Sequence, residues 1–153
     1  QLSENDAMRT AIREAVADGL PTVAECGGFL YLHTTLTDRE GHSYPMAGGL
    51  PGKCFDTGHL VRFGYIELEE SSGYFMSHGS SIRAHEFHYY DSEDNGADCI
   101  ATKPSTGRNY PCIHVGESHW YGFPHLYYPS CPEFAERFVE NAKKFSKSGK
   151  DVL

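Results

Sequence analysis

The segment Pro21–Leu32 constrains the fold of this chain more than any other, because it places one cysteine between a strand and a helix. It reads Pro-Thr-Val-Ala-Glu-Cys-Gly-Gly-Phe-Leu-Tyr-Leu. A β-favouring run leads to Cys26, and an apolar, helix-compatible run follows the two glycines. This order is typical of a nucleophile elbow, a sharp strand-to-helix turn that presents a reactive side chain at the end of a sheet. Such a turn requires small residues two positions before and after the nucleophile, where Ala24 and Gly28 stand.

The placement of Cys26 predicts a nucleophilic thiol. Backbone N–H groups at the start of the following helix would face the sulfur and favour the thiolate. The alternative is a buried, inert cysteine, which is what we expect of Cys99 in a short strand. The total of five cysteines is odd and no CxxC pair occurs, so a disulfide framework is disfavoured and a cytoplasmic location is expected.

Length and charge exclude some classes of protein. A chain of 153 residues is most simply a single domain, residues 1–153. The formal net charge of -8 argues against binding a nucleic-acid backbone, which needs clustered Lys and Arg. No apolar run approaches the ~20 residues of a membrane span, and the first residues show no signal-peptide pattern. We therefore expect neither a nucleic-acid nor a membrane partner.

The first third of the chain predicts an α/β fold. Ser3 is a candidate cap for a helix whose apolar residues repeat at helical spacing up to Val16, and Gly19 ends it. A buried strand at Pro21–Glu25 and the elbow helix follow. The order helix, strand, elbow, helix indicates a parallel sheet with covered faces.

The remaining chain has the pattern of an antiparallel meander. Strands are expected at Val61–Glu69, Tyr74–Ser77, Ser81–Tyr89, Asp98–Thr102 and His119–Phe123. A last helix follows, with Ser130 and Glu133 as a capping box and Pro132 in the first turn.

A thiol nucleophile needs a base, and histidine is the usual one because its pKa lies near neutrality. His125 stands just past the last expected strand and before the last helix. Loops at the carboxyl edge of an α/β sheet often carry catalytic residues. The alternative is a histidine that satisfies a loop carbonyl.

A second polar and aromatic cluster is Arg83–Tyr90. Strand alternation places Glu86 and His88 on one face and His85 on the other. Glu86 and His88 would hydrogen-bond to each other or form half of a metal site. The zinc-protease motif needs HExxH on a helix, whereas this segment is HExH in a strand, so support of a neighbouring site is favoured and no metal ligand is assigned.

Five motifs in a fixed order carry a resemblance to a known family. They are AECGGFLYL, MAGGLPG, RFGYIEL, RAHEFHYYDSE and GFPHLYYPSCPEF. From about Ser3 to Phe145 the chain resembles the glutaminase domain of the cobyrinate a,c-diamide synthase and cobyric acid synthase family. The members of this family are class I, or triad, glutamine amidotransferases. The resemblance implies a flavodoxin-like fold with a mixed sheet flanked by helices.

The resemblance also implies a mechanism. Cys26 would attack the side-chain amide of glutamine, His125 would protonate the departing ammonia, and the Gly27 N–H would donate to the oxyanion. Water activated by His125 would then hydrolyse the γ-glutamyl thioester. Glu86, His88 and His85 would line or support the substrate pocket. The ammonia would pass to an ATP-dependent synthetase domain that amidates a carboxylate on a corrin ring or a similar acid. No cofactor is expected in this chain, and ATP and Mg²⁺ are expected on the synthetase domain.

The chain departs from the family pattern at three points. Tyr127 stands where a triad has Glu, as in the cobyrinate-type branch, and Ala84 replaces the glycine of a Gly-His-Glu segment. The family also carries early strands and a glycine-rich loop, with a second oxyanion donor, ahead of the region that resembles this chain. We therefore expect a partial domain without its N-terminal strands or the synthetase domain. Losing one oxyanion donor costs roughly two to three orders of magnitude in rate, so the chain alone is expected to be a poor glutaminase.

Two other functions stay open at this point. One is a cysteine hydrolase of the same superfamily, which would share the elbow cysteine but not the His-Glu-Phe-His-Tyr block. The other is an amidotransferase-like domain that binds a partner or ligand without turnover. Pairing into a homodimer and the identity of the ammonia acceptor are also left open by the sequence.

Overall fold

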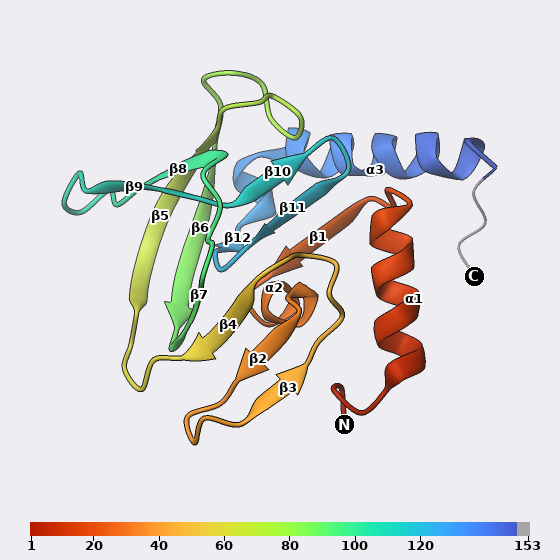
Figure 1. Ribbon diagram of the computed structural model, residues 1–153. Coiled ribbons are helices and arrows are strands. Elements are labelled where there is room, and N and C mark those ends of the chain that lie inside the picture. The colour runs from red at the N-terminus through yellow and green to blue at the C-terminus, as the bar shows by residue number, and fades with distance from the viewer. Residues whose placement is uncertain (150–153) are drawn as a thin grey trace.

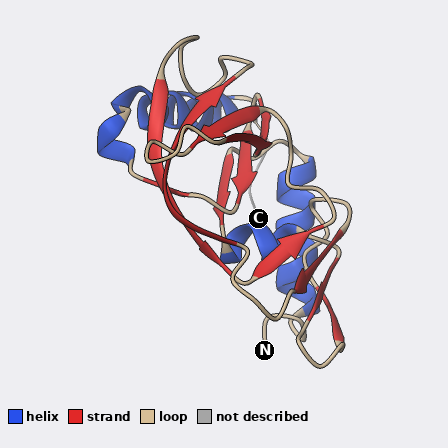
Figure 2. Ribbon diagram, turned by 90° about the vertical axis from the view of Figure 1, so that its left-hand side faces the viewer, coloured by secondary structure: helices blue, strands red, loops and turns tan. Residues whose placement is uncertain are grey.

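The computed structural model describes residues 1–149 and shows an α/β architecture (Figure 1). The helices in this range are α1 (Asp6–Ala17), α2 (Gly27–Leu32) and α3 (Pro132–Lys147), with a short 3-10 helix at Tyr128–Ser130. The strands are β1 (Thr22–Glu25), β2 (Thr35–Thr37), β3 (Ser43–Pro45), β4 (Lys53–Asp56), β5 (Arg62–Glu70), β6 (Ser81–His88), β7 (Tyr90–Ser92), β8 (Cys99–Thr102), β9 (Asn109–Cys112), β10 (His114–Gly116), β11 (His119–Gly122) and β12 (His125–Leu126). Figure 2 shows helices on both sides of the strands.

The strands of the described range form three sheets. In the order β1-β11-β10, β1 is parallel to β11 and β10 is antiparallel to it. The order β3-β2-β4-β7 is also mixed, because β2 and β4 are parallel. The sheet β12-β6-β5-β8-β9 is antiparallel throughout. The expected α/β class with mixed sheets and flanking helices is confirmed. The expected antiparallel pairing of the middle region is also confirmed, but the strands do not form a meander, because β8 pairs with β5 rather than with β6 or β7.

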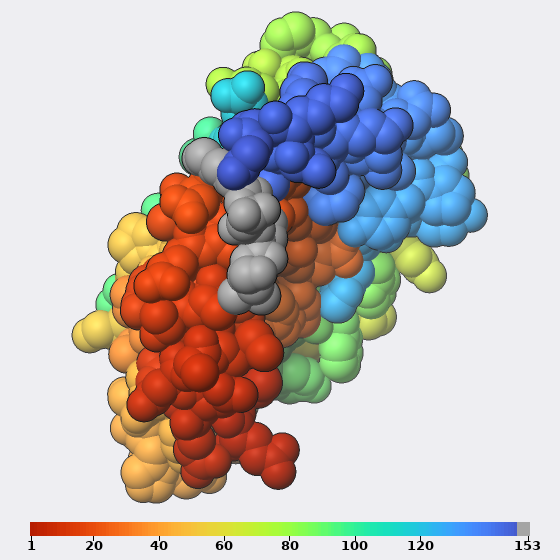
Figure 3. Space-filling view, turned by 90° about the vertical axis from the view of Figure 1, so that its right-hand side faces the viewer, coloured from red at the N-terminus to blue at the C-terminus, as the bar shows by residue number. Residues whose placement is uncertain are grey.

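Two apolar clusters form the core. The larger contains Trp120 of β11, Phe134 of α3 and Phe75, all fully buried, with the Phe75 and Phe134 rings stacked at 5.0 Å. The smaller gathers Phe29 of α2 and Phe123 beside Ala24 and Tyr121, and α1 packs against it. Figure 3 shows α1 and α3 making up most of one face of the molecule. The end of β1 thus lies between a helix-covered side and the antiparallel sheet.

The expected strand at Tyr74–Ser77 is wrong. The carboxylate of Glu70, only 6% exposed, accepts hydrogen bonds from the backbone N–H groups of Tyr74, Phe75 and Met76. A single side chain therefore satisfies donors that a strand would pair with a neighbouring strand. The result is a tight loop between β5 and β6.

Both expected caps are also wrong. The α1 cap is Asn5 rather than Ser3, and its side chain accepts a hydrogen bond from Met8 N. The residue before α3 is Cys131, because the Ser130 hydroxyl accepts from Arg83 N and donates to Tyr127 O. Glu133 binds the backbone and hydroxyl of Ser77 instead of closing a capping box. The position of Pro132 in the first turn is confirmed.

Candidate active site

Cys26 lies at the turn between β1 and α2 with the backbone geometry of a nucleophile elbow. Its φ is 44° and its ψ is -103°, in a region that non-glycine residues rarely adopt. Strain of this kind costs about 1–3 kcal/mol and is often found at functional sites. A Cβ built on Gly27 meets nothing within 4 Å, so the space beside the cysteine is open. A Cβ on Gly28 would lie 3.6 Å from the Ala24 Cβ, an ordinary contact, so the crowding there is milder than expected.

The thiol of Cys26 is half-buried, and burial raises its pKa above the usual value. The Gly27 backbone N–H lowers the pKa, as the sequence predicts, and the negative charge of Glu25 raises it. Burial is the largest of these effects, so the expected lowering by the helix N–H is present but does not decide the direction of the pKa shift. The resting sulfur carries its proton, so a nucleophilic role needs a base. The other four cysteines are buried, Cys99 in β8 as predicted.

His125 belongs to a segment that is tied to the end of β1. The backbone N–H of Cys26 donates to Gly122 O at 2.9 Å, three residues before His125. Three residues after His125, the Tyr128 hydroxyl donates to the Glu25 carboxylate at 2.5 Å. These bonds are made on either side of His125 in the sequence, and they hold its segment next to the end of β1, where Cys26 lies. No hydrogen bond joins Cys26 Sγ to His125 in the described range 1–149.

A stack of rings fills the space behind this strand end. Phe29 on α2 contacts Phe123 edge to face at 5.1 Å, and Phe123 lies flat against His88 with ring centroids 3.9 Å apart. Phe29 is three residues after Cys26, and Phe123 is two residues before His125. The stack therefore connects the elbow helix, the histidine segment and β6 through buried side chains.

His88 and Glu86 face the core, as the alternation predicts. His88 Nδ1 lies 2.7 Å from Tyr90 O, which places the proton on Nδ1, and Nε2 is buried without a hydrogen-bond partner in the described part of the chain. Burial lowers the pKa of His88, so the imidazole is neutral. The Glu86 carboxylate accepts from the Tyr110 hydroxyl, and the Arg62 guanidinium lies over the Tyr110 ring at 3.8 Å. The expected hydrogen bond between Glu86 and His88 is not made.

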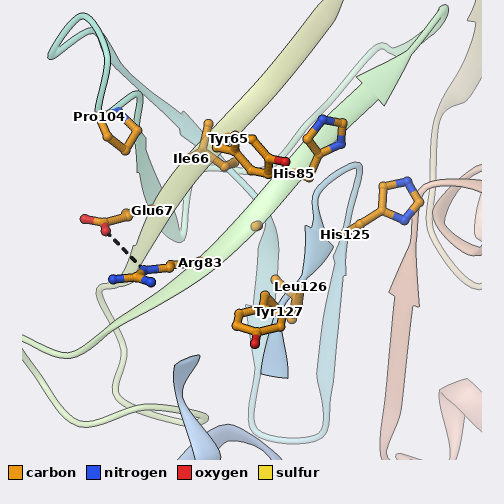
Figure 4. Close-up of a pocket in the computed structure, with 10 residues that line it drawn as sticks. Tyr65, Ile66, Glu67, Arg83, His85, Pro104, His125, Leu126 and Tyr127 are labelled. Atoms are coloured by element: carbon orange, nitrogen blue, oxygen red, sulfur yellow. Dashed lines mark ion pairs between the residues drawn. The ribbon is translucent and has the colours of Figure 1, made fainter. Parts of the chain in front are cut away.

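His85 lies on the opposite face of β6, beside a groove of about 710 Å³ (Figure 4). The groove is lined by Tyr65, Ile66, Glu67, Arg83, Ala84, His85, Pro104, His125, Leu126 and Tyr127. His125 lies at one end, and the Glu67–Arg83 ion pair lies at the other. In the ladder between β12 and β6, His125 is the direct partner of His85. The two histidines thus share one end of the groove, whereas Glu86 and His88 lie behind the sheet.

Sequence reasoning assigned no role to Glu25 and Tyr128, although each lies inside a motif that it used. Glu25 immediately precedes the nucleophile, and Tyr128 lies in the segment that carries His125. Their bond spans 103 positions, so no local pattern could reveal it. Among residues 1–149 no group of three or more His, Cys, Asp or Glu is arranged to hold a metal ion, and no helix is long and apolar enough to cross a membrane.

Fold and site together define an α/β protein with a cysteine at a nucleophile elbow and a histidine-bearing segment at the same strand end. Residues 1–114 match the CobB/CobQ-like glutamine amidotransferase domain family. The chain therefore belongs to that family, and its α/β architecture is that of a class I glutamine amidotransferase. The matched range contains Cys26 and all of β6 but ends before His125.

Curated relatives extend the similarity over nearly the whole chain. The chain is 34% identical over 150 residues to the cobyrinate a,c-diamide synthase of Caldanaerobacter subterraneus subsp. tengcongensis, covering 96% of this chain and 33% of that protein. It is 30% identical over 156 residues to the enzyme of that name from Dehalococcoides mccartyi, covering 95% and 33%. With the Priestia megaterium enzyme the identity is 29% over 155 residues, covering 99% and 34%. The chain thus spans about one third of the length of these relatives.

Proposed function

We propose that this chain is a glutaminase that uses Cys26 as nucleophile and His125 as general base and acid. The observation that carries the proposal is the strained cysteine at the end of β1, with open space beside Gly27 and the His125 segment tied to the same strand end. Membership of the amidotransferase family supports the choice of glutamine as the substrate.

The proposed reaction starts from a protonated thiol, because burial raises the pKa of Cys26. His125 takes the thiol proton as the sulfur attacks the amide carbon of glutamine. The negative charge that develops on the amide oxygen is stabilised by the Gly27 N–H. The amide C–N bond then breaks, and the imidazolium gives its proton to the departing nitrogen. Ammonia is released, and a γ-glutamyl thioester remains on Cys26. Water attacks the thioester with His125 as base, which releases glutamate and restores the thiol.

We assign supporting rather than chemical roles to the polar residues of β6. His88 is stacked on Phe123 and is neutral, so its packing stabilises the segment that leads to His125. Glu86 is held by Tyr110 behind the sheet. His85 and Arg83 line the groove, and His85 lies next to His125 at its end, so His85 has access to a molecule bound there.

In the whole protein, we propose that the ammonia is delivered to an ATP-dependent synthetase domain. The curated relatives are about three times as long as this chain and are named cobyrinate a,c-diamide synthases. A carboxylate of cobyrinate is therefore the acceptor that we favour, in cobalamin biosynthesis. ATP and Mg²⁺ would bind the synthetase domain.

The test is covalent labelling by diazo-oxo-norleucine, an electrophilic glutamine analogue, with the modified residue located by mass spectrometry. It is applied to the 153-residue chain and to any longer form of the protein that contains it. We expect labelling at Cys26, protection by glutamine, and complete loss in Cys26→Ala. Cys54→Ala is the matched control, because Cys54 is fully buried in β4 and burial raises its pKa to about 12. Failure to label Cys26 in every form would favour a non-catalytic binding domain, and labelling without protection by glutamine would favour a different cysteine hydrolase.

A further inference from the structure

One side-chain hydrogen bond connects the nucleophile's strand with the segment that carries His125. The Tyr128 hydroxyl donates to Glu25 Oε1 at 2.5 Å. Glu25 is the residue before Cys26, and Tyr128 is the third residue after His125. Both burial and the Glu25 carboxylate raise the pKa of the Tyr128 phenol, so it keeps its proton and stays a donor at neutral pH.

Apart from the Phe123 ring contact with Phe29 and the bond from Cys26 N to Gly122 O, the His125 segment is anchored on its far side. His125 and Leu126 pair with β6, and Tyr127 N donates to Arg83 O at 2.8 Å. These contacts fix the segment to the antiparallel sheet, which does not contain Cys26. Within residues 1–149, the bond from Tyr128 to Glu25 is the one hydrogen bond between residues 123–128 and residues 25–26.

We infer that Glu25 and Tyr128 are a positioning pair that sets the distance between the His125 imidazole and the Cys26 sulfur. The inference rests on the proposed function, in which a proton passes between these two groups. Proton transfer needs its partners within hydrogen-bond reach, and a misplacement of about 1 Å lowers a rate by up to about 100-fold. A two-residue strand on another sheet is a weak anchor for such a distance. The bond from Tyr128 to Glu25 attaches the segment a second time, one residue from the nucleophile, and so restricts this distance further.

Glu25 has two effects that different substitutions separate. Its oxygen accepts the tyrosine hydrogen bond, and its charge raises the pKa of the Cys26 thiol. Glu25→Gln keeps an oxygen acceptor and removes the charge, whereas Glu25→Ala removes both. Tyr128→Phe removes the hydroxyl donor and leaves the charge and the ring. A positioning role therefore predicts that Glu25→Gln keeps the rate of reaction at Cys26, whereas Tyr128→Phe and Glu25→Ala lower it.

The experiment measures the limiting rate and half-saturating concentration of Cys26 labelling by diazo-oxo-norleucine. We expect Tyr128→Phe and Glu25→Ala to lower the limiting rate about 10- to 100-fold, with half-saturation changed less than about 2-fold. The double variant Glu25→Ala/Tyr128→Phe should be no slower than the slower single variant, because both remove one interaction. Glu25→Gln should label within about 3-fold of the unsubstituted protein. Tyr74→Phe, which removes an exposed hydroxyl in the β5–β6 loop, should change nothing.

Two outcomes overturn the inference. One is a folded Tyr128→Phe variant that labels at the normal rate. The other is a Glu25→Gln variant as slow as Glu25→Ala, which would show that the charge acts and not the bond.

A second measurement needs no glutamine analogue, so it separates failure of this inference from failure of the proposed function. We expect Cys26→Ala to shift the NMR resonances of the His125 imidazole, and the same substitution to have no such effect in a Tyr128→Phe background. If diazo-oxo-norleucine labels Cys26 in none of the proteins but the His125 shift still depends on Tyr128, the proposed function is wrong and the positioning pair is supported. If Cys26→Ala shifts the His125 resonances equally in both backgrounds, or in neither, the pair does not position the histidine.

Discussion

The two halves of the candidate site are held in place by different parts of the fold. Cys26 sits at the end of a parallel strand, and its position follows from the backbone of β1, the elbow and α2. His125 sits in a two-residue strand at the edge of an antiparallel sheet, and its position follows from contacts between segments far apart in sequence. The position of the proposed nucleophile follows from the local sequence, whereas that of the proposed base follows from tertiary structure.

This difference implies that the positions of Cys26 and His125 are sensitive to different substitutions. The strained φ of Cys26 persists because the surrounding strand and helix over-determine it. The His125 segment has no comparable local constraint, so its placement depends on the Phe29–Phe123–His88 stack and on the bond from Tyr128 to Glu25. Substitutions of residues around His125 should therefore displace His125 more than substitutions of residues around Cys26 displace Cys26.

The largest effect that distinguishes the two halves is expected from His125→Ala. Loss of a general base and acid lowers a rate by roughly 10²- to 10⁴-fold, and Cys26 should stay labelled at a slow residual rate. Steady-state release of ammonia and the rate of labelling measure the effect. The matched control is His42→Ala in the β2–β3 turn, where the imidazole is exposed. Equal rates for the His125→Ala variant and the unsubstituted protein would remove His125 from the mechanism.

The next effect concerns the ring stack. Phe123→Ala removes a side chain that is 4% exposed and contacts both Phe29 and His88. Creating that cavity should lower the free energy of unfolding by about 3–5 kcal/mol. Phe87→Ala on β6 removes the same side chain where it is 49% exposed, and should cost about 1 kcal/mol. Denaturant unfolding followed by circular dichroism measures both, and similar losses would show that the stack does not stabilise the segment.

The same contrast explains what could be predicted from the sequence. The elbow, the strands β5, β6, β8 and β11, and the buried Cys99 follow from periodicity and turn chemistry, which are local. The loop after β5 does not, because the Glu70 carboxylate binds three backbone N–H groups that the pattern had assigned to a strand. Ser130 failed as a cap for a similar reason, since its hydroxyl binds Arg83 N, 47 positions away. His125 was identified through family resemblance, because position alone favoured it weakly and the contacts that tie it to β1 are long-range.

A smaller effect is expected at the glycine where the histidine segment leaves β11. A Cβ on Gly122 would lie 2.4 Å from Ile113 Cδ1, and Ile113 is fully buried with a φ of 69°. Gly122→Ala should therefore cost about 1–3 kcal/mol of unfolding free energy. Gly27→Ala is the matched substitution at the nucleophile, where a Cβ meets nothing within 4 Å and the N–H is kept. Thermal unfolding should separate the two, and a Gly27→Ala variant destabilised as much as Gly122→Ala would contradict this account of the elbow.

The smallest effect is a dependence of stability on pH, to which His88, on the His125 side of the site, contributes. Burial lowers the pKa of His88, and it also lowers the pKa of His33 and of His119. Each imidazole binds a proton more readily in the unfolded chain, so its contribution to stability is complete above about pH 6.5 and is lost as the pH falls through the folded pKa. The free energy of unfolding should decline between pH 7 and 5, by at most about 1.4 kcal/mol per pH unit for each histidine. His88→Gln should reduce that slope, whereas Phe123→Leu, which perturbs the same stack without a titratable group, should lower stability by the same amount at every pH. A slope unchanged in His88→Gln would mean that His88 is not held neutral against Phe123, and the link from β6 to the His125 segment would then need another basis.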